Sequence, residues 1–464
     1  MKQTLPRLLL CAPGSGSGKT TVTCALLQAL LNRKLRPVAF KSGPDYIDPM
    51  FHTEVMDTRS RNLDLFFLGE ARVRNLLWTN GRTGDLAVIE GAMGYYDGIG
   101  MGERASAYQL ARTTGTPAVL VADMKGKALS AAATVAGMMA LRQPSGIAGV
   151  ILNRVSPMLY PRLKDCIERE TGVKVYGFLP QKPECMVESR HLGLVTAGEI
   201  GDLREKLNKL AELAEEGLDL DGLLELARSA PPLEVPEEEK LPQIPGRPRI
   251  AVARDEAFCF YYADGLDLLE RLGAELVPFS PVKDQTLPER IGGLYLGGGY
   301  PELYAKALSQ NTSMREAVLK AVQAGLPTVA ECGGFLYLQK TLADPEGRAW
   351  PMCNVFPSEG HNTGRLGRFG YVTLTAQRDG LLGPAGSAFP AHEFHYWDVD
   401  APGSDFRAEK PRDGVTNTKP RQWDCGYHTT TLYAGFPHLH FCAMPQAAER
   451  FVRAAAAWRQ THNP

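Results

Sequence analysis

Short apolar runs alternate with amphipathic segments through the first part of the chain. The runs cover residues 8–11, 38–40, 86–89, 118–121 and 150–152, and each ends in a polar or glycine-rich turn. A helical pattern follows the first run as far as Leu30 and recurs between several of the others. Strands that are apolar throughout and alternate with helices predict a parallel sheet covered on both faces. Ligands bind such sheets at the carboxyl ends of the strands, so the turns after the runs are expected to form one site.

The turn after the first run predicts a phosphate-binding loop. It matches the pattern G-x-x-x-x-G-K-[ST] except at the first position, which is Pro13. Small residues let backbone N–H groups surround phosphate oxygens, while Lys19 reaches the outer phosphates and the Thr20 hydroxyl holds Mg²⁺. The flanking strand and helix disfavour the alternative, a glycine-rich turn without a ligand. The residues assigned to ATP are Gly14, Ser15, Gly16, Ser17, Gly18, Lys19, Thr20 and Thr21, together with Asn153 after the fifth run.

Acidic turns follow the second and third runs, at 41–49 and 90–98. Mg²⁺ prefers a few carboxylates together with phosphate oxygens and water. Asp45 and Glu90 are therefore expected to complete a magnesium site beside Thr20. An aspartate in a Gly-Pro turn is more often a turn former, but its place at the same sheet edge as the phosphate loop favours a ligand.

The composition changes in the middle of the chain. Apolar residues recur at helical spacing over 203–228, which predicts one or two amphipathic helices. Residues 229–249 are rich in proline and contain three consecutive glutamates, which is typical of an extended linker. We expect domains over 1–200 and 249–464, joined by a helical segment and linker over 201–248.

The second half begins another series of strands and helices, with apolar runs at 250–253, 276–279, 293–296 and 328–330. The last run breaks at Glu331-Cys332-Gly333-Gly334 and continues as a helix, which predicts a nucleophile elbow with Cys332 at its tip. The helix N-terminus is expected to lower the pKa of the thiol and favour the thiolate. An inert core cysteine is the alternative.

Two further segments complete this predicted site. Backbone N–H groups of Gly298, Gly299 and Gly333 are expected to form an oxyanion hole. The segment 433–441 alternates like a strand and places His438 and His440 on one face, so His438 is the candidate base. The segment 392–395 is not a zinc motif, because H-E-x-x-H would need a histidine where Tyr396 stands.

Charge and cysteine content narrow the classes of function. The formal net charge is -1, from 51 basic and 52 acidic residues, which argues against broad attraction to nucleic acid or membrane surfaces. The nine cysteines are scattered, without a C-x-x-C pair, as expected for a reducing cytoplasm. No apolar stretch is long enough to span a bilayer, and a signal peptide is not expected. A cytoplasmic protein with locally charged ligand sites is the prediction.

In this order, the motifs resemble the glutamine-dependent cobyrinate a,c-diamide synthase family of cobalamin biosynthesis over essentially the whole chain. The resemblance rests on residues 12–21, 41–49, 90–98, 297–300, 331–334 and 438–441. It implies an N-terminal ATP-dependent amidoligase domain with a P-loop and a parallel sheet, similar to dethiobiotin synthetase. It also implies a C-terminal α/β domain of the class I-like glutamine amidotransferase type.

The resemblance implies a mechanism and small-molecule partners. Glutamine is hydrolysed through a Cys332 thioester, and the ammonia attacks carboxylates that ATP and Mg²⁺ have activated as acyl phosphates. A closed path for ammonia between the domains is expected. Asp48 and Asp97 are expected to orient the substrate or the intermediate, with outer-shell magnesium ligands as the alternative. Related amidotransferases carry a glutamate two residues after the histidine; here His440 stands there, and its role is left open.

The implied substrate is a tetrapyrrole polycarboxylate, with cobyrinate favoured over hydrogenobyrinate and nickel-sirohydrochlorin. Arg59, Arg61, Arg190 and His191 are candidates to meet its carboxylates. A cobyric acid synthase is disfavoured by the turn at 42–46. A remote alternative is a nucleotide-switched scaffold of the partitioning-ATPase kind with an inactive amidotransferase domain, but Gly14 stands where those proteins commonly have a second lysine. The oligomeric state, a homodimer included, is left open.

Overall fold

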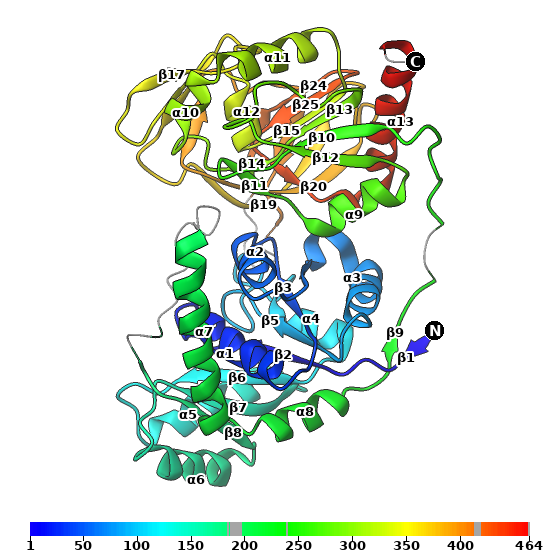
Figure 1. The fold of residues 1–464 in the computed structure, drawn as a ribbon. Coiled ribbons are helices and arrows are strands. Elements are labelled where there is room, and N and C mark those ends of the chain that lie inside the picture. Colours follow the sequence, from blue (N-terminus) through cyan, green and yellow to red (C-terminus); the bar gives the residue numbers. More distant parts are fainter. Residues whose placement is uncertain (183–184, 186–196, 238–239, 413–418, 463–464) are drawn as a thin grey trace. The chain divides into compact units, whose positions relative to one another are not determined.

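The structure is a computed structural model that describes residues 1–182, 185, 197–237, 240–412 and 419–462. These residues divide into two compact units, one up to residue 237 and one from residue 240 onward (Figure 1). Each unit has its own central sheet and its own buried core.

The first unit is built on a seven-stranded sheet in the order β4-β3-β5-β2-β6-β7-β8, and every neighbouring pair in it is parallel. Its strands are β2 (Arg7–Cys11), β3 (Pro37–Ser42), β4 (Ser60–Leu63), β5 (Leu86–Glu90), β6 (Ala118–Asp123), β7 (Ile147–Asn153) and β8 (Val175–Leu179). The five apolar runs predicted as strands all lie in this sheet. The predicted parallel α/β fold is therefore confirmed.

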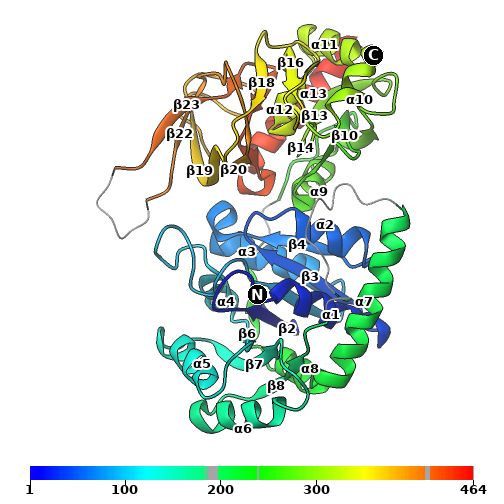
Figure 2. The ribbon, with the colours of Figure 1, turned by 90° about the vertical axis from the view of Figure 1, so that its left-hand side faces the viewer.

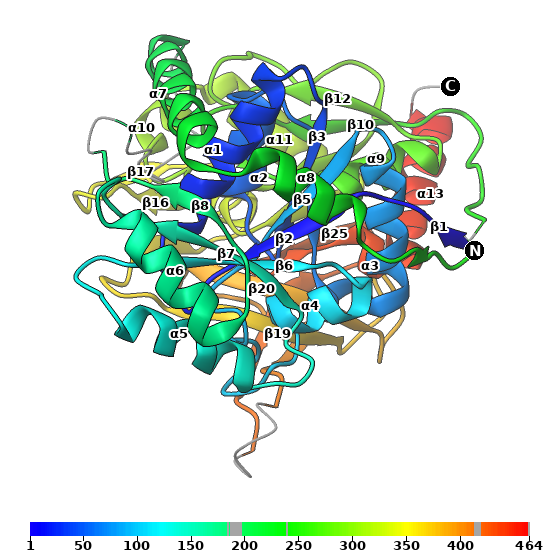
Figure 3. The ribbon, with the colours of Figure 1, turned by 90° about the horizontal axis from the view of Figure 1, so that it is seen from below.

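Helices connect these strands and bury the sheet. They are α1 (Lys19–Asn32), α2 (Ile47–Glu54), α3 (Leu65–Gly81), α4 (Ala107–Thr114), α5 (Ser130–Ala140), α6 (Tyr160–Thr171), α7 (Ala197–Gly217) and α8 (Leu220–Arg228). Helix α7 lies along α1, as Figure 3 shows, and Leu210 and Ala214 pack in the same core as Leu26. The helices predicted over 203–228 thus complete the first unit's core.

The proline-rich segment is extended but packed. Its strand β9 (Leu233–Glu234) pairs with β1 (Lys2–Gln3), and Leu233 and Val235 are buried. The buried guanidinium of Arg7 donates to the carbonyl oxygen of Pro231 at 2.7 Å. Prolines remove N–H donors but leave carbonyl acceptors, so such a segment can lie against a folded surface. The domain boundaries at 200/201 and 248/249 stay predictions.

The second unit has a six-stranded sheet in the order β12-β10-β13-β15-β25-β24, parallel except for the edge strand β24. Its strands are β10 (Arg249–Ala253), β12 (Glu275–Phe279), β13 (Ile291–Leu296), β15 (Thr328–Glu331), β24 (Tyr427–His428) and β25 (Leu432–Gly435), and its helices are α9 (Ala263–Arg271), α10 (Ala305–Gln310), α11 (Thr312–Gln323), α12 (Gly333–Tyr337) and α13 (Pro445–His462). Two short strands, β11 (Phe258–Phe260) and β14 (Gly298–Gly299), pair beside it.

Further sheets extend this unit (Figure 2). An antiparallel sheet has the order β23-β22-β19-β20-β26, with β19 (Arg368–Ala376), β20 (Ala388–His395), β22 (Phe406–Glu409), β23 (Gln422–Cys425) and β26 (His438–Leu439). A four-stranded sheet joins β16 (Thr341–Ala343), β17 (Ala349–Pro351), β18 (Glu359–Asn362) and β21 (Trp397–Val399).

One predicted strand is wrong. The segment 433–441 was expected to be continuous, but β25 ends at Gly435 in the parallel sheet, and β26 begins at His438 in the antiparallel sheet. Residues 441–443 then form a single 3₁₀ turn, η3 (Phe441–Ala443). Pro437 between the strands lacks a ladder donor, which fits a change of sheet at this point. In the described part of the chain, no helix has the length and hydropathy to cross a membrane.

Candidate functional site

The phosphate loop connects β2 to α1. Gly18 has φ 91°, and a Cβ there would stand 2.0 Å from Asn153 Nδ2, so only glycine fits. Asn153, at the end of β7, donates from Nδ2 to the carbonyl oxygen of Ser17 at 2.9 Å, and Ser17 Oγ donates to that of Gly14 at the same distance. Asn153 therefore supports the loop's backbone from the neighbouring strand end.

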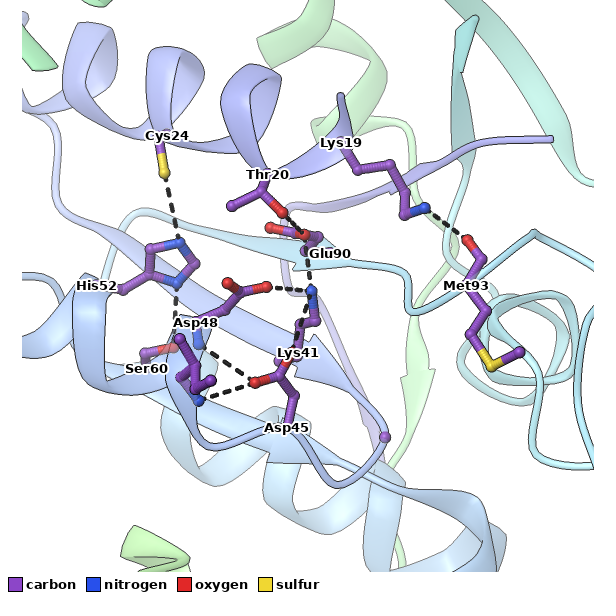
Figure 4. Close-up of polar contacts among 12 residues, drawn as sticks. Lys19, Thr20, Cys24, Lys41, Asp45, Asp48, His52, Ser60, Glu90 and Met93 are labelled. Atoms are coloured by element: carbon purple, nitrogen blue, oxygen red, sulfur yellow. Dashed lines mark hydrogen bonds and ion pairs between the residues drawn. The ribbon is translucent and has the colours of Figure 1, made fainter. Parts of the chain in front are cut away.

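Lys19 begins helix α1 and folds back over the loop. Its Nζ donates to the carbonyl oxygen of Met93 at 2.5 Å (Figure 4). It also donates to the carbonyl oxygen of Gly14 at 3.3 Å. Burial lowers the pKa of Lys19. These carbonyl acceptors are neutral, so phosphate oxygens would replace them as stronger, charged acceptors for the same ammonium group.

A buried lysine gathers the acidic residues of the second and third turns. Lys41, on β3, donates to Glu90 Oε1 at 2.7 Å, makes an ion pair with Asp48, and lies 3.8 Å from Asp45 Oδ2 (Figure 4). Glu90 Oε1 also accepts from the Thr20 hydroxyl at 2.8 Å. The structure thus joins the phosphate loop to both acidic turns.

The charges in this cluster shift one another's pKa. Burial alone would raise the pKa of Glu90, but the charge of Lys41 and hydrogen bonds from Lys41 and Thr20 hold it at about 2. Burial and the charge of Glu90 raise the pKa of Asp48 to about 7, against the opposing effect of Lys41. The pKa of Lys41 lies above its usual value because the surrounding carboxylates outweigh its burial. Lys41 is therefore a fixed positive charge.

The donor set fits a magnesium ion that also has phosphate ligands. Glu90 Oε2 is buried and has no hydrogen-bond partner, and the Thr20 hydroxyl lies beside the other oxygen of the same carboxylate. Within the described ranges, no group of three His, Cys, Asp or Glu side chains forms a metal cage. Mg²⁺ commonly takes one or two carboxylates and completes its shell with phosphate oxygens and water.

Other predicted residues have local contacts. Asp45 Oδ1 accepts from the backbone N–H of Ile47 at 2.8 Å, and Asp97 Oδ2 accepts from that of Gly94 at 3.0 Å, so both shape their turns. Arg59 donates to Asn80, a contact that does not involve the site. Arg61 donates to the carbonyl oxygen of Ser60. Arg190 and His191 lie outside the described residues.

In the second unit, Cys332 stands between β15 and α12 with φ 47°, a conformation that non-glycine residues seldom adopt. Its N–H donates to the carbonyl oxygen of Gly435, and the N–H of Gly334 donates to that of Gly297 at 2.9 Å. A Cβ at Gly334 would lie 2.2 Å from the carbonyl oxygen of Leu296. The tight strand-turn-helix expected of a nucleophile elbow is present.

A loop of three glycines at 297–299, called the glycine loop below, lies between this elbow and His438. A Cβ at Gly298 would stand 2.3 Å from Cε1 of His438, and one at Gly333 would stand 3.0 Å from the backbone nitrogen of Gly299. The elbow, the loop and the histidine thus meet, although they are far apart in sequence. Their roles as nucleophile, oxyanion hole and base stay predictions.

The expected direction of the Cys332 pKa shift is wrong. Burial and the charge of Glu302 raise the pKa of this thiol, and the hydrogen bond from the Gly333 N–H lowers it too little to compensate. Burial also lowers the pKa of His438 to about 3. Both groups are therefore neutral at rest, and the thiol must lose its proton during attack. Five-residue α12 is too short to offset the desolvation.

His440 takes a place apart from His438. Its ring stacks on Tyr262 with centroids 4.6 Å apart, while Glu331 Oε2 lies 3.9 Å from His438 Nδ1.

Lys41 and Glu331 were not among the predicted site residues, although each stands at the edge of a motif that was recognised. A charged residue at the end of an apolar strand was the available signal in both cases.

Comparisons with known proteins agree with the two units. Residues 8–194 match a family described as CobQ/CobB/MinD/ParA nucleotide binding domain, and residues 249–445 match a CobB/CobQ-like glutamine amidotransferase domain. The fold and the two sites therefore define a P-loop nucleotide-binding enzyme joined to a glutamine amidotransferase.

Relatives extend over both units. A cobyrinate a,c-diamide synthase of Caldanaerobacter subterraneus subsp. tengcongensis is 39% identical over 96% of this chain and 97% of its own length. The synthase of Listeria monocytogenes serovar 1/2a is 40% identical over 94% and 96%, and that of Salmonella typhimurium is 40% identical over 96% and 97%. The chain belongs to the cobyrinate a,c-diamide synthase family.

Proposed function

We propose that this chain uses ATP and glutamine to amidate the a- and c-side-chain carboxylates of cobyrinate in cobalamin biosynthesis. The observation that carries the proposal is that one chain holds two sites. One is the phosphate loop, linked through Thr20 to Glu90, and the other is the Cys332 elbow, which packs against the same glycines at 298–299 as His438 does. The names of its full-length relatives support the substrate. Both half-reactions of a glutamine-dependent amidation then have a site.

The first unit activates the carboxylate. A carboxylate is a poor acyl donor because its charge repels nucleophiles and oxide is a poor leaving group. Its oxygen attacks the γ-phosphorus of ATP, and an acyl phosphate and ADP form. Lys19 and Lys41 neutralise charge on the transferring phosphoryl group. Thr20, Asp45 and Glu90 would hold Mg²⁺, which when bound supplies further charge neutralisation.

The buried Asp48 has a separate role in this proposal. Because burial raises the pKa of Asp48 to about 7, this group can exchange a proton near neutral pH. Asp48, with Asp97, orients the substrate carboxyl and the attacking ammonia. Ammonia displaces phosphate from the acyl phosphate and loses one proton, which leaves the amide.

The second unit supplies the ammonia. His438 takes the Cys332 proton as sulfur attacks the glutamine amide carbon, and N–H groups of Gly298, Gly299 and Gly333 receive the developing oxyanion. The proton passes to the departing nitrogen, which leaves a thioester and ammonia. Water then hydrolyses the thioester to glutamate and restores the thiol.

The substrate is tested by product mass. The purified chain is incubated with ATP, Mg²⁺ and glutamine, and with cobyrinate, hydrogenobyrinate or nickel-sirohydrochlorin in parallel. We expect the diamide of cobyrinate to form fastest. A larger kcat/KM for either of the other two rings would identify that ring as the substrate of the same reaction. Failure to form an amide from any of the three would refute the proposal.

The division of labour is tested with Cys332→Ala. This variant should lose glutamine-dependent synthesis and keep synthesis with added ammonium chloride, because it removes the nucleophile without touching the first unit. Glutamine-dependent synthesis that survives the substitution would exclude the Cys332 thioester. The cytoplasmic location stays a prediction from composition, and the oligomeric state stays open.

A further inference from the structure

The residue before the proposed nucleophile points a carboxylate at the proposed base. Glu331 ends β15, and its Oε2 lies 3.9 Å from Nδ1 of His438. Its Oε1 accepts from the backbone N–H of Leu439 at 3.1 Å, and the Tyr295 hydroxyl donates to Oε2 at 3.3 Å. The Glu331 side chain is 1% exposed and that of His438 is 3% exposed. The carboxylate and the imidazole therefore face each other in a buried part of the unit.

Such a carboxylate is what a catalytic histidine commonly needs. An imidazole acts as a base through one ring nitrogen only if the other carries its hydrogen, and a carboxylate acceptor fixes that tautomer. The position two residues after the base holds His440, whose ring stacks on Tyr262. It offers no carboxylate to His438, whereas Glu331 lies on the Nδ1 side of the ring.

Two other buried glutamates of this unit have different surroundings. Glu393 lies 3.9 Å from the guanidinium of Arg368, and Glu302 lies in the turn after the glycine loop. Glu331, by contrast, lies 3.9 Å from His438 Nδ1.

We propose that Glu331 is the positioning residue of the glutaminase site: its carboxylate accepts the Nδ1–H of His438 and directs Nε2 toward the Cys332 thiol. During attack the S–H bond breaks, an Nε2–H bond forms, and sulfur bonds to the amide carbon. The imidazolium formed in this step is stabilised by the Glu331 carboxylate. The inference rests on the proposed function of the second unit.

The same side chain also fixes where the base stands. Its bond to the Leu439 N–H joins the end of β15 to β26, the two-residue strand that carries His438. The carboxylate therefore sets both the position of the strand and the tautomer of the ring. A 3.9 Å separation shortens when the imidazolium forms, since hydrogen bonds at catalytic groups tighten in the reacting complex.

Several titratable groups surround Glu331, and its surroundings set the pH at which its carboxyl group ionises. Its charge acts on Cys332, Tyr261, Tyr295 and Tyr433, and His438 lies beside it. Burial raises the pKa of Glu331 to about 8, although Leu439 and Tyr295 donate hydrogen bonds to it. The accepting, ionised form therefore increases as the pH rises through this value.

The test is Glu331→Gln in the full chain, measured as glutamine hydrolysis. Glutamine is isosteric and still accepts from Leu439, but it carries no charge and its NH₂ group cannot accept the Nδ1–H. We expect kcat to fall about 100-fold with KM for glutamine within about twofold, because the side chain orients the base without binding substrate. The wild-type rise in kcat/KM near pH 8 should be lost, and Glu331→Asp should restore part of kcat.

Tyr295→Phe is the matched control. It removes the other side-chain hydrogen bond to Glu331 and leaves the carboxylate beside His438, so kcat should stay within about threefold of wild type. Synthesis with ammonium chloride should be unchanged in both variants, which reports an intact first unit. Far-UV and near-UV circular dichroism equal to that of wild type would report an intact second unit.

Two outcomes overturn the inference. One is glutaminase activity of Glu331→Gln within about threefold of wild type. The other is an equal loss of glutaminase activity in Glu331→Gln and Tyr295→Phe, which would make Glu331 structural. A wild-type chain that hydrolyses no glutamine would instead refute the proposed function itself.

Discussion

Lys41 Nζ lies 2.7 Å from Glu90 Oε1, and both side chains are buried at the carboxyl end of the first unit's sheet. The two strands that carry them, β3 and β5, pair in register with Lys41 opposite Glu90. Asp48 pairs with the same ammonium group. One cation therefore compensates the charge of at least one fully buried carboxylate beside the phosphate loop.

Removing that cation should destabilise the protein. Lys41→Met leaves Glu90 buried without its counter-charge, and loss of one partner of a buried pair costs about 3–5 kcal/mol. Unfolding by urea, followed for the first unit by hydrogen exchange, measures the change. Lys209→Met removes a surface pair with Glu205 and should cost at most about 0.5 kcal/mol. Equal costs for the two variants would contradict the assigned role of Lys41.

The buried His52 gives a pH-dependent stability. Burial lowers its pKa to about 4, so between that value and about 6.5 the unfolded chain binds the proton more tightly. Stability present above pH 6.5 is lost as the pH falls toward 4, by up to about 1.4 kcal/mol per pH unit. The difference in unfolding free energy between wild type and His52→Asn should follow this course. A pH-independent difference for His52→Asn would show that this histidine titrates alike in the folded and unfolded chain.

Gly298→Ala should disable glutamine hydrolysis alone. The added Cβ would stand 2.3 Å from His438 Cε1, so the ring must move. Misplacing a catalytic group by about 1 Å costs about 100-fold in rate. Ammonia-dependent synthesis should be retained. Gly137→Ala, in α5 with no atom within 4 Å of its Cβ position, should leave both activities unchanged. Full glutaminase activity in Gly298→Ala would show that the glycine loop is not part of the glutaminase site.

Lys19→Ala should have the opposite effect. Without the ammonium group that faces the loop, amidation with either nitrogen source should fall about 100- to 1000-fold. Glutamine hydrolysis measured without the tetrapyrrole should survive. Calorimetric titration with ATP and Mg²⁺ checks whether the loss lies in binding or in phosphoryl transfer. Equal loss of both activities would indicate obligatory coupling or misfolding.

The sequence by itself determined the elements that depend on local pattern. Strands that are buried on both faces of a sheet need apolar side chains at successive positions, so short apolar runs bounded by turns predict such strands. The glycines at 18 and 334 stand at positions where a Cβ would collide with neighbouring atoms. The phosphate loop, the acidic turns and the Cys332 elbow can therefore each be recognised from a single stretch of sequence. The order of these motifs along the chain then carries the resemblance to the family.

Only the tertiary structure decided the relations between distant segments and the extent of desolvation. The pairing of β3 with β5 places Lys41 among carboxylates, and the change of sheet between β25 and β26 brings His438 to Glu331. The pKa of Cys332 rises, contrary to the sequence-based expectation, because burial outweighs a short helix. Such distances and dielectric effects arise from packing, which no single stretch of sequence contains.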